Sequence, residues 1–258
     1  MLNATVVSRK DVTDSLLILG VKPDHEIPDF QAGQYVALGM FGSAPRLAGC
    51  APDPEVVAAE KLVKRTYSIG SSPYQKDAIE FYIAVVREGL LTPRLALLKE
   101  GDRVYIAPKI TGKFVLSDVP ADRNLVFVST GTGIAPFISM LRSPSTWEHP
   151  ERKVTLLQGI RYPQDLAYSE ELAELAKSRS NFSFRFTVSR PNDDWAGDRG
   201  YVQTYFKNGA VAVQPENDHV FLCGNPAMVN DVESMLCGQG YIVHSNKTPG
   251  SLHLEKYW

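Results

Sequence analysis

The segment Asn124–Leu141 constrains the fold of this chain more than any other stretch. It begins with a short apolar run, Leu125–Val128, of the kind that forms a buried parallel strand. Gly131 and Gly133 follow as a tight turn, and Pro136 suits the first turn of a helix, where a missing N–H costs nothing. Because a glycine turn before a helix offers backbone N–H groups and a helix dipole to a phosphate, the segment predicts a phosphate-binding α/β unit.

The rest of the second half alternates strands with helices, which predicts an open parallel sheet of the Rossmann-like α/β kind. The expected strands after Val126–Val128 are Val154–Gln158, Phe182–Val188 and His219–Cys223, and the expected helices are Pro136–Leu141, Ser169–Lys177, Tyr201–Phe206 and Pro226–Cys237, the last capped by Asn225. Ligands of such sheets bind at the carboxyl ends of the strands. Val126–Val128 and His219–Cys223 both end in glycine turns, so we expect a ligand to be held there from two sides.

The first half has a different pattern, with about six short runs rich in Val, Ile, Tyr and Leu separated by turn residues. They are Thr5–Ser8, Leu16–Val21, Gln34–Leu38, Arg65–Ile69, Ile79–Val86 and Arg103–Ile106. Short strands at this spacing with one short helix predict a closed antiparallel β-barrel. The predicted helix has Thr92 as its N-cap, Pro93 as its first residue and Lys99 in its last turn, and Gly101 lies just beyond its end.

The segment Gly42–Val63 interrupts the strand pattern and is interpreted as an insertion between two strands. Asp53 is expected to cap a helix of about two turns over Val56–Val63, with Pro54 and Glu55 in its first turn. Further along the chain, Pro120–Asn124 is the expected linker between a domain of residues 1–121 and a domain of residues 122–258.

The composition excludes several classes of protein. A net charge of −2 over 258 residues gives no bulk surface for nucleic acid or anionic membrane, and no apolar run approaches the roughly 20 residues of a membrane helix. The three cysteines, Cys50, Cys223 and Cys237, are widely spaced and indicate a reducing cytoplasm without a disulfide framework. The five histidines are scattered, so we expect no protein-bound metal.

The run Lys64–Ser68 places an arginine, an aromatic ring and a hydroxyl on one expected strand. Arg65 suits a phosphate, Tyr67 a ring or a sugar, and Ser68 a hydrogen bond to a ring atom. Strand alternation puts Arg65 and Tyr67 on one face and Ser68 on the other, so we expect a bulge or an edge position.

Four motifs in order, Arg65–Ser68, Gly89–Arg94, Gly131–Pro136 and Cys223–Met228, resemble those of the ferredoxin–NADP reductase family. The C-terminal residues Glu255-Lys-Tyr-Trp258 resemble the bacterial flavodoxin/ferredoxin–NADP reductases within it. The resemblance covers nearly the whole chain except Gly42–Val63.

The resemblance implies that the first domain binds FAD. It places Arg65 on the pyrophosphate, Tyr67 and Ser68 at the isoalloxazine, and the Leu90–Thr92 loop on the phosphates. A C-terminal tail, residues 251–258, is expected to return to the flavin. The implied FAD residues are Arg65, Thr66, Tyr67, Ser68, Tyr82, Ile83, Ala84, Val85, Leu90, Leu91, Thr92, Thr132, Tyr257 and Trp258.

The second domain is expected to bind NADP(H). Arg161, Arg190 and Arg199 follow strand ends, where arginines suit a 2′-phosphate. No acid stands where an NAD site would hold the ribose diol, although Asp165 and Asp198 are close to that place in the sequence. The implied NADP residues are Thr130, Gly131, Gly133, Pro136, Arg161, Tyr162, Ser189, Arg190, Arg199, Cys223, Gly224, Asn225, Pro226 and Met228.

The activity implied is hydride transfer from NADPH to FAD, then transfer of single electrons to or from ferredoxin or flavodoxin. The implied catalytic residues are Cys223, Tyr257, Ser68 and Glu255. Cys223 shapes the nicotinamide pocket, and Tyr257 stacks on the flavin as a gate. The resemblance leaves the role of Glu255 open, and we expect a monomer.

Two other enzymes share the expected fold. A reductase component of an oxygenase usually carries clustered cysteines for an iron–sulfur domain, which this sequence lacks, and often prefers NADH, which the arginines oppose. A free flavin reductase would not need a C-terminal aromatic lid such as the one expected here. A non-catalytic subunit is a third alternative, against which the intact Arg65–Ser68 motif, Cys223 and the C-terminal tail argue.

Overall fold

The computed structural model describes residues 1–54 and 56–256 of the chain. These residues form two compact units. Unit 1 comprises Met1–Val115 with Ala135–Ser143, and unit 2 comprises Leu116–Ile134 with the chain from Pro144 onward. The two domains expected from the sequence, residues 1–121 and 122–258, are defined by the cofactor that each is expected to bind. That division stays a prediction.

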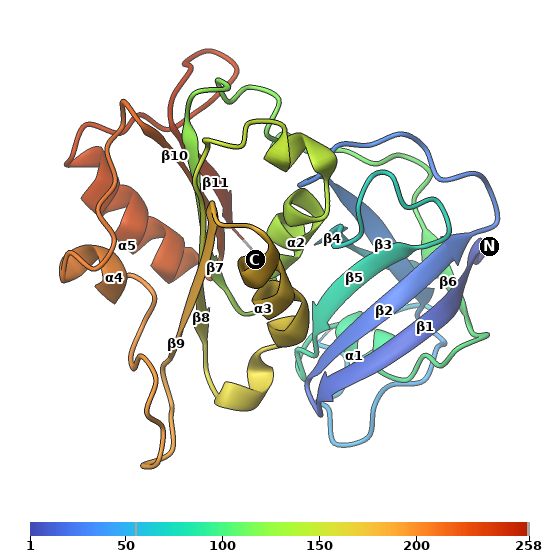
Figure 1. The fold of residues 1–258 in the computed structure, drawn as a ribbon. Coiled ribbons are helices and arrows are strands. Elements are labelled where there is room, and N and C mark those ends of the chain that lie inside the picture. The colour runs from blue at the N-terminus through green and yellow to red at the C-terminus, as the bar shows by residue number, and fades with distance from the viewer. Residues whose placement is uncertain (55, 257–258) are drawn as a thin grey trace. The chain divides into compact units, whose positions relative to one another are not determined.

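Unit 1 is a six-stranded antiparallel sheet with the strand order β4-β3-β6-β1-β2-β5 (Figure 1). Its strands are β1 (Ala4–Thr13), β2 (Leu16–Pro23), β3 (Tyr35–Phe41), β4 (Leu62–Ser68), β5 (Ile79–Ala84) and β6 (Arg103–Ile106). The two outer strands approach each other just beyond β4, where the Gly70 N–H donates to the Glu80 carbonyl at 2.8 Å. The expected β-barrel is therefore confirmed.

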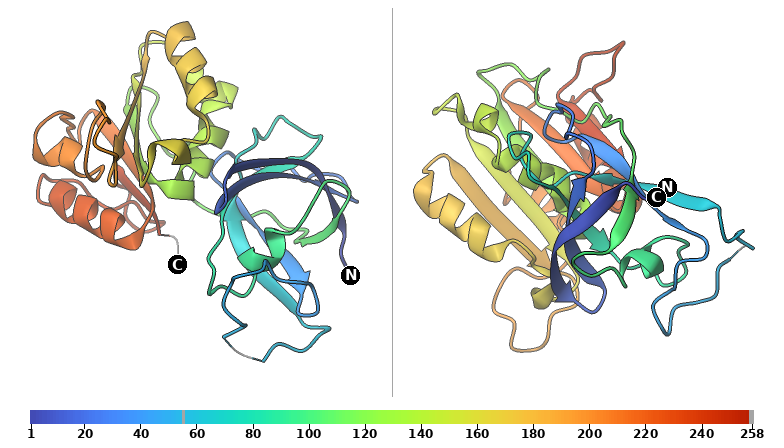
Figure 2. Two further views of the ribbon diagram at one scale, coloured as in Figure 1. Left: turned by 90° about the horizontal axis from the view of Figure 1, so that it is seen from below. Right: turned by 90° about the vertical axis from the view of Figure 1, so that its right-hand side faces the viewer.

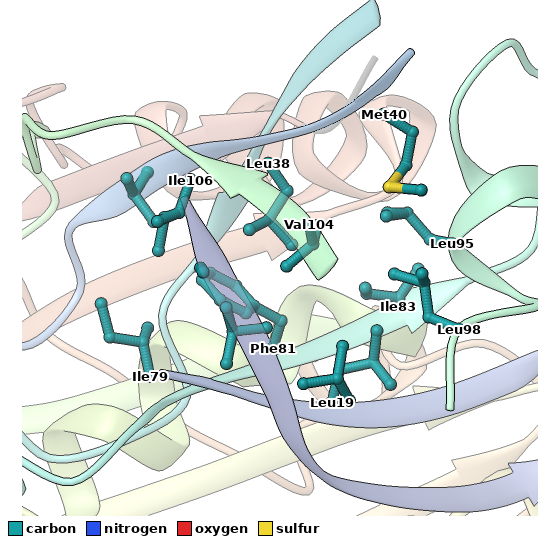
Figure 3. Packing of buried hydrophobic residues seen from close by; sticks show 14 of the residues in the cluster. Leu19, Leu38, Met40, Ile79, Phe81, Ile83, Leu95, Leu98, Val104 and Ile106 are labelled. Carbon is teal, nitrogen blue, oxygen red and sulfur yellow. The ribbon is translucent and has the colours of Figure 1, made fainter. Parts of the chain in front are cut away.

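The interior of the barrel is apolar because successive strand residues alternate between its inner and outer faces. Leu19, Leu38, Phe81, Val104 and Ile106 are buried from four different strands and pack together (Figure 3). At one end Leu95 and Leu98 enter the same cluster from the short helix α1 (Thr92–Leu95) and the turn after it.

Helix α1 is shorter than expected and begins differently. Leu91 occupies the N-cap position and Thr92 is the first helical residue. The Thr92 hydroxyl instead binds Val86, six positions earlier: it accepts from the Val86 N–H at 2.8 Å and donates to the Val86 carbonyl at 3.2 Å. After Leu95 the chain continues in i→i+3 turns, so the helix is observed but its predicted extension to a last turn at Lys99 is wrong.

The insertion between β3 and β4 contains a second wrong prediction. Residues 56–61 form a loop and a turn, and Leu62 already begins β4, so the helix expected over Val56–Val63 is not formed. Asp53 does not act as its N-cap, because both carboxylate oxygens bind arginine side chains. Val56 is fully exposed, which leaves an isolated helix there little apolar surface to bury. Glu55 lies outside the described residues.

Helix α2 (Ala135–Leu141) belongs to unit 1, and Pro136 is its second residue. The Ser139 hydroxyl donates to the Ser71 carbonyl at 2.7 Å. Arg142 donates to the Gly70 carbonyl at 3.0 Å and pairs with Glu80 at 2.8 Å.

Unit 2 is a five-stranded parallel sheet with the order β11-β10-β7-β8-β9. The strands are β7 (Asn124–Thr130), β8 (Val154–Ile160), β9 (Phe182–Val188), β10 (Asp218–Gly224) and β11 (Leu252–Lys256). Helix α3 (Ser169–Ser178) covers one face, and α4 (Thr204–Lys207) and α5 (Pro226–Cys237) cover the other (Figures 1 and 2). Short 3₁₀ turns complete the unit at Gly131–Ile134, Pro144–Trp147 and Pro163–Asp165. The expected α/β sheet is confirmed, and β11 is a strand that the sequence did not predict.

The strand order makes β7 and β10 the reversal point of the sheet. From β7 the chain runs outward to β8 and β9, then returns to the other side of β7 as β10 and β11. Ligands of open α/β sheets bind outside the carboxyl ends of strands at such a point.

No helix in the described part of the chain is long and apolar enough to cross a membrane.

Candidate functional site

The carboxyl ends of β7 and β10 form two interlocked glycine turns, residues 130–133 and 223–225, which we call the switch-point turns. Ser129 lies opposite Cys223 in the parallel ladder. Beyond that pair the Thr130 hydroxyl accepts a hydrogen bond from the Asn225 N–H at 2.8 Å. The sequence motifs predicted both turns, and the structure brings them together.

Glycine is required in both turns for a steric reason. Gly224 has φ +133°, and a Cβ there would lie 2.4 Å from the Thr130 hydroxyl oxygen. A Cβ on Gly133 would lie 2.4 Å from the Cys223 carbonyl oxygen. Each turn therefore fills the space that a side chain on the other would need.

The backbone at Gly131 faces open space, because a Cβ there would meet no atom within 4 Å. The start of α5 lies across the turn pair, with the Asn225 side chain accepting from the Ala227 N–H at 2.8 Å and Pro226 as the first helical residue. The exposed backbone at Gly131 and the N-terminus of α5 therefore lie together, and backbone N–H groups at a helix N-terminus are suited to bind a phosphate.

Three predicted residues near the turns are buried. Pro136 and Thr132 are both buried, Pro136 in α2 of unit 1 and Thr132 in the 3₁₀ turn of unit 2. The Met228 side chain packs in the apolar cluster of unit 2, beneath the start of α5. The Met228 side chain therefore contributes to packing, and the predicted contact of this residue with NADP stays a prediction.

Strand β11 places Glu255 beside Cys223. The two residues are partners in the parallel ladder, and the Cys223 Sγ lies 3.8 Å from the Glu255 Oε1. Cys223 is fully buried. The sequence named both residues only through the resemblance, and it did not predict the strand that joins them. Tyr257 and Trp258, expected to cover the flavin, lie outside the described residues.

The neighbouring strand ends carry the predicted arginines. The Ser189 N–H donates to the Ile160 carbonyl at 2.9 Å, and the Arg190 N–H donates to the Arg161 carbonyl at 2.8 Å, which aligns the two chain segments after β8 and β9. Arg161 and Arg190 are exposed, and neither is ion-paired within the described residues. The Arg190 guanidinium donates a hydrogen bond to the Tyr162 hydroxyl oxygen, which raises the pKa of Arg190 above its ordinary value.

The third arginine, Arg199, differs from the other two. It also lies beside the end of β9, through a bridge to Val188. Its Nη2 donates to the carbonyls of Asn192, Asp193 and Trp195 at 3.3, 2.9 and 2.7 Å. This guanidinium therefore stabilises the loop after β9.

Both acids that would suit an NAD ribose are already engaged. The Asp165 carboxylate accepts from the Tyr162 N–H at 3.0 Å. Asp198 accepts from the Tyr205 hydroxyl at 2.7 Å and from Arg185 at 3.0 Å, and the Tyr205 hydrogen bond is the main cause of its lowered pKa. The charge at these strand ends thus favours a phosphate over a ribose diol.

In unit 1 the predicted flavin motif lies on β4, an outermost strand of the sheet, in continuous register with β3. The expected edge position is therefore observed, without a bulge. Arg65 is exposed and donates to the Lys64 carbonyl at 2.8 Å, whereas Ser68 is buried. The Tyr67 ring contacts Phe81 edge-on with centroids 6.4 Å apart, and its burial raises the pKa of the phenol.

The second predicted flavin segment follows β5. Ile83 and Leu91 are fully buried in the barrel core, so their side chains are committed to packing. Tyr82 is also buried, while Ala84, Val85, Leu90 and Thr92 are half-buried. The exposed Arg65 guanidinium, the Tyr67 ring and the half-buried residues Leu90 and Thr92 fit a flavin nucleotide in chemical character.

The sequence did not predict an ionic cluster that adjoins this segment. Asp53 from the insertion binds both Arg46 and Arg94. Nothing in the local pattern pairs these residues, because Asp53 and Arg94 are 41 positions apart.

Two other features do not contribute to this site. A cavity of about 380 Å³ lies at the amino ends of β7, β8 and β10, the opposite end of the sheet from the switch-point turns. Among residues 1–54 and 56–256, no three His, Cys, Asp or Glu side chains are grouped to hold a metal ion.

The chain is similar to several known proteins. A family model described as an oxidoreductase NAD-binding domain matches residues 127–234. The flavodoxin/ferredoxin–NADP reductase of Escherichia coli is 32% identical over 254 residues, covering 95% of this chain and 94% of that protein. The ferredoxin–NADP reductase of Azotobacter vinelandii is 31% identical over 243 residues, covering 88% and 86%. The crystal structure of a ferredoxin NADP+ reductase from Neisseria gonorrhoeae with bound FAD and NADP matches with a TM-score of 0.82 and 26% identity, covering 98% and 97%.

Proposed function

Since the chain belongs to the flavodoxin/ferredoxin–NADP reductase family, we propose that it transfers electrons between NADP(H) and a small redox protein, ferredoxin or flavodoxin, by way of FAD. Unit 2 binds NADP(H) and unit 1 binds FAD. The direction of net flow in the cell depends on the carrier and is left open by the proposal.

The observation that carries the choice of NADP(H) is the pair of exposed arginines at the ends of β8 and β9. A backbone hydrogen bond joins Arg161 and Arg190, and neither has an acidic partner among the described residues. A dianionic 2′-phosphate is the ligand that two guanidiniums without an acidic partner bind best. Asp165 and Asp198, which would favour NAD, are held by their own chain.

The switch-point turns support the rest of the dinucleotide. The exposed backbone at Gly131 and the N-terminus of α5 bind the pyrophosphate. The buried Cys223 side chain lies at the bottom of the pocket that holds the nicotinamide. Cys223 acts here by its shape, because it is buried and no histidine partner is available in sequence to activate it as a nucleophile.

Unit 1 supplies the flavin contacts. Arg65 binds the FAD pyrophosphate, Tyr67 and Ser68 contact the isoalloxazine, and the Leu90–Thr92 backbone accepts the phosphates. When bound, FAD supplies the exchange between two-electron hydride chemistry and single-electron transfer. The protein contributes orientation and charge.

Three finer statements belong to the same proposal. The carrier is ferredoxin, flavodoxin or both, the enzyme acts as a monomer, and it works in the cytoplasm. Glu255, next to Cys223, is the acidic group best placed to influence the nicotinamide side of the site.

Spectroscopy of the purified protein tests the proposal. It should be yellow and should release FAD on denaturation. Under anaerobic conditions NADPH should bleach the visible absorbance of the flavin much faster than NADH does. A colourless protein without FAD contradicts the reductase function. Equal reduction by NADH contradicts the assignment of Arg161 and Arg190, and reduction of free flavin in preference to ferredoxin or flavodoxin favours a flavin reductase.

A further inference from the structure

The first part of the insertion 42–61, between β3 and β4, is bound to the segment 87–93. Two backbone hydrogen bonds join them: the Ala51 N–H donates to the Arg87 carbonyl at 3.1 Å, and the Leu47 N–H donates to the Pro93 carbonyl at 2.9 Å. At the base of the insertion the Gly42 N–H donates to the Lys61 carbonyl at 2.8 Å. The insertion thus covers the chain on both sides of Leu90–Thr92.

One carboxylate joins the two segments. Asp53 accepts two hydrogen bonds from Arg94, at 2.9 Å from Nη1 and 2.7 Å from Nη2, and a third from Arg46 at 2.5 Å. The Arg94 side chain is only 2% exposed, and those of Arg46 and Asp53 are 16% and 21% exposed. A buried guanidinium needs such a partner, because an unpaired buried charge is strongly unfavourable.

The same guanidiniums also hold backbone carbonyls of both segments. Arg46 donates to Gly89 at 3.0 Å and to Ala51 at 2.5 Å. Arg94 donates to Leu90 at 2.5 Å and to Gly42 at 2.8 Å. The Arg46–Asp53–Arg94 triad therefore fixes the carbonyls of Gly89 and Leu90 and, with them, the direction of the N–H groups that follow.

We propose that the insertion positions the FAD-binding segment, with Asp53 as the positioning residue that holds Leu90–Thr92 in its cofactor-binding conformation. The inference rests on the proposed function, because it takes that segment to receive the FAD phosphates. The triad keeps one net positive charge beside them, since two guanidiniums face one carboxylate. Asp53 itself contacts Arg46 and Arg94 and acts on the cofactor only through them.

The variant Asp53→Asn tests the inference through the rate at which the holoprotein releases FAD on dilution, followed by the recovery of flavin fluorescence. Loss of the carboxylate leaves two guanidiniums facing a neutral amide, and we expect release to become about tenfold faster. Arg46→Ala keeps the pair between Asp53 and Arg94, so it is expected to fold and to release FAD about threefold faster. Asp29→Asn, which removes an exposed pair with Lys76 in the same unit, is the matched control and should leave the rate unchanged.

Two further measurements separate positioning from general damage to the fold. Amide hydrogen exchange of Asp53→Asn should speed up at Leu47 and Ala51, whose N–H groups are bonded across the contact, and at Arg94, whose N–H is bonded to the Leu91 carbonyl, but not in β1 or β2. The visible spectrum of the bound flavin should not shift, because Tyr67 and Ser68 are unchanged.

The outcomes are distinguishable. Unchanged FAD release in both Asp53→Asn and Arg46→Ala, with faster exchange at Ala51, overturns the inference and leaves the insertion a structural element only. A shifted flavin spectrum with faster exchange throughout unit 1 also overturns it, because the loss would then be global. Absence of FAD from the unmodified protein is the outcome that contradicts the proposed function itself.

Discussion

The two regions that we propose bind the phosphates of the cofactors are stabilised in opposite ways. In unit 2, the switch-point turns interlock through bare backbone: Gly133 and Gly224 leave no room for a side chain, and the strands beneath them set their position. In unit 1, the segment Arg87–Pro93 has few regular contacts of its own and is held by charged side chains from an insertion. The first region depends on the absence of side chains and the second on their presence.

Because of this difference, one proposed phosphate-binding region can be recognised in the amino-acid sequence and the other cannot. A glycine turn between a strand and a helix is visible in a few consecutive residues. An ionic triad assembled from positions 46, 53 and 94 is visible only after folding. Three experiments follow that break or sharpen the comparison.

Gly224→Ala should have the largest effect, because it breaks the backbone-only region. The new Cβ would lie 2.4 Å from the Thr130 hydroxyl and 2.8 Å from its carbonyl, at φ +133°. We expect a loss of about 3 kcal/mol of unfolding free energy and a fall of roughly 100-fold in NADPH affinity. Urea denaturation and a binding titration measure both quantities.

The control for this substitution is Gly209→Ala, also in unit 2. Gly209 has φ +70°, but a Cβ there meets no atom within 4 Å. It should cost about 1 kcal/mol and leave NADPH affinity unchanged. Equal losses in the two variants would show that backbone strain, rather than the contact between the turns, explains the effect.

As the pH is lowered, unit 2 should unfold before unit 1. In unit 2, His219 Nδ1 and His253 Nε2 lie 3.0 Å apart, and both rings are buried. Burial lowers the pKa of His219 to about 4 and that of His253 to about 3, from 6.5. Arg123, Arg152 and His244 disfavour the proton on His219 further, and only Asp122 opposes them.

The sign follows from the two states. Between pH 6.5 and about 4 the unfolded chain takes up protons that the folded chain excludes, so the stability of unit 2 falls as the pH falls through that window. At about 1.4 kcal/mol for each pKa unit, the loss reaches a few kcal/mol. In unit 1, Arg94 lowers the pKa of Asp53 below 3.8, so the stability from the triad is present above that pH and is lost only as the pH falls further.

Circular dichroism and intrinsic fluorescence during acid titration therefore should show unit 2 unfolding first. His253→Phe should flatten the loss between pH 6.5 and 4, because the aromatic ring keeps the stack on Phe221, whose centroid lies 4.0 Å away, without a titrating nitrogen. His25→Asn, at an exposed position, is the control. A single acid transition that is unchanged in His253→Phe would contradict the assignment.

Substitution of the two exposed arginines should have the smallest effect and the most selective one. Arg161→Ala and Arg190→Ala are each expected to raise the KM for NADPH about tenfold and to leave the KM for NADH unchanged, because each removes one charged contact to the 2′-phosphate. Lys177→Ala, which removes an exposed pair with Glu174 on α3, is the control. Steady-state kinetics with both coenzymes provide the measurement. Equal increases in the KM for NADPH and the KM for NADH would contradict a contact between these arginines and the 2′-phosphate.

Local patterns predicted most of the fold. The strands β6 and β9 and helix α5 begin and end where the sequence placed them, and Asn225 caps α5 as expected. The two errors in the helices, the length and N-cap of α1 and the helix expected over Val56–Val63, have one feature in common. In each case a residue with capping chemistry, Thr92 or Asp53, uses its side chain for another partner, Val86 or Arg94.

The candidate site was only partly predictable. The sequence identified Gly131, Gly133, Gly224 and Asn225 as two separate turns, and the structure joins them through the Thr130 hydroxyl. Strand β11, which carries Glu255 to Cys223, was missed because five residues after a polar loop give little period to detect.

By itself, the sequence determined most of the strands and helices, the glycine positions and the family, because each depends on residues close together in the chain or on motifs in a set order. Only the tertiary structure decided which arginines remain available for a ligand. Arg161 and Arg190 are exposed without an acidic partner in the described chain, Arg199 is bound to loop carbonyls, and Arg46 and Arg94 are bound to Asp53. The physical reason is that a guanidinium carries the same charge in every sequence context, while its partner is chosen by contacts that form only when distant segments meet.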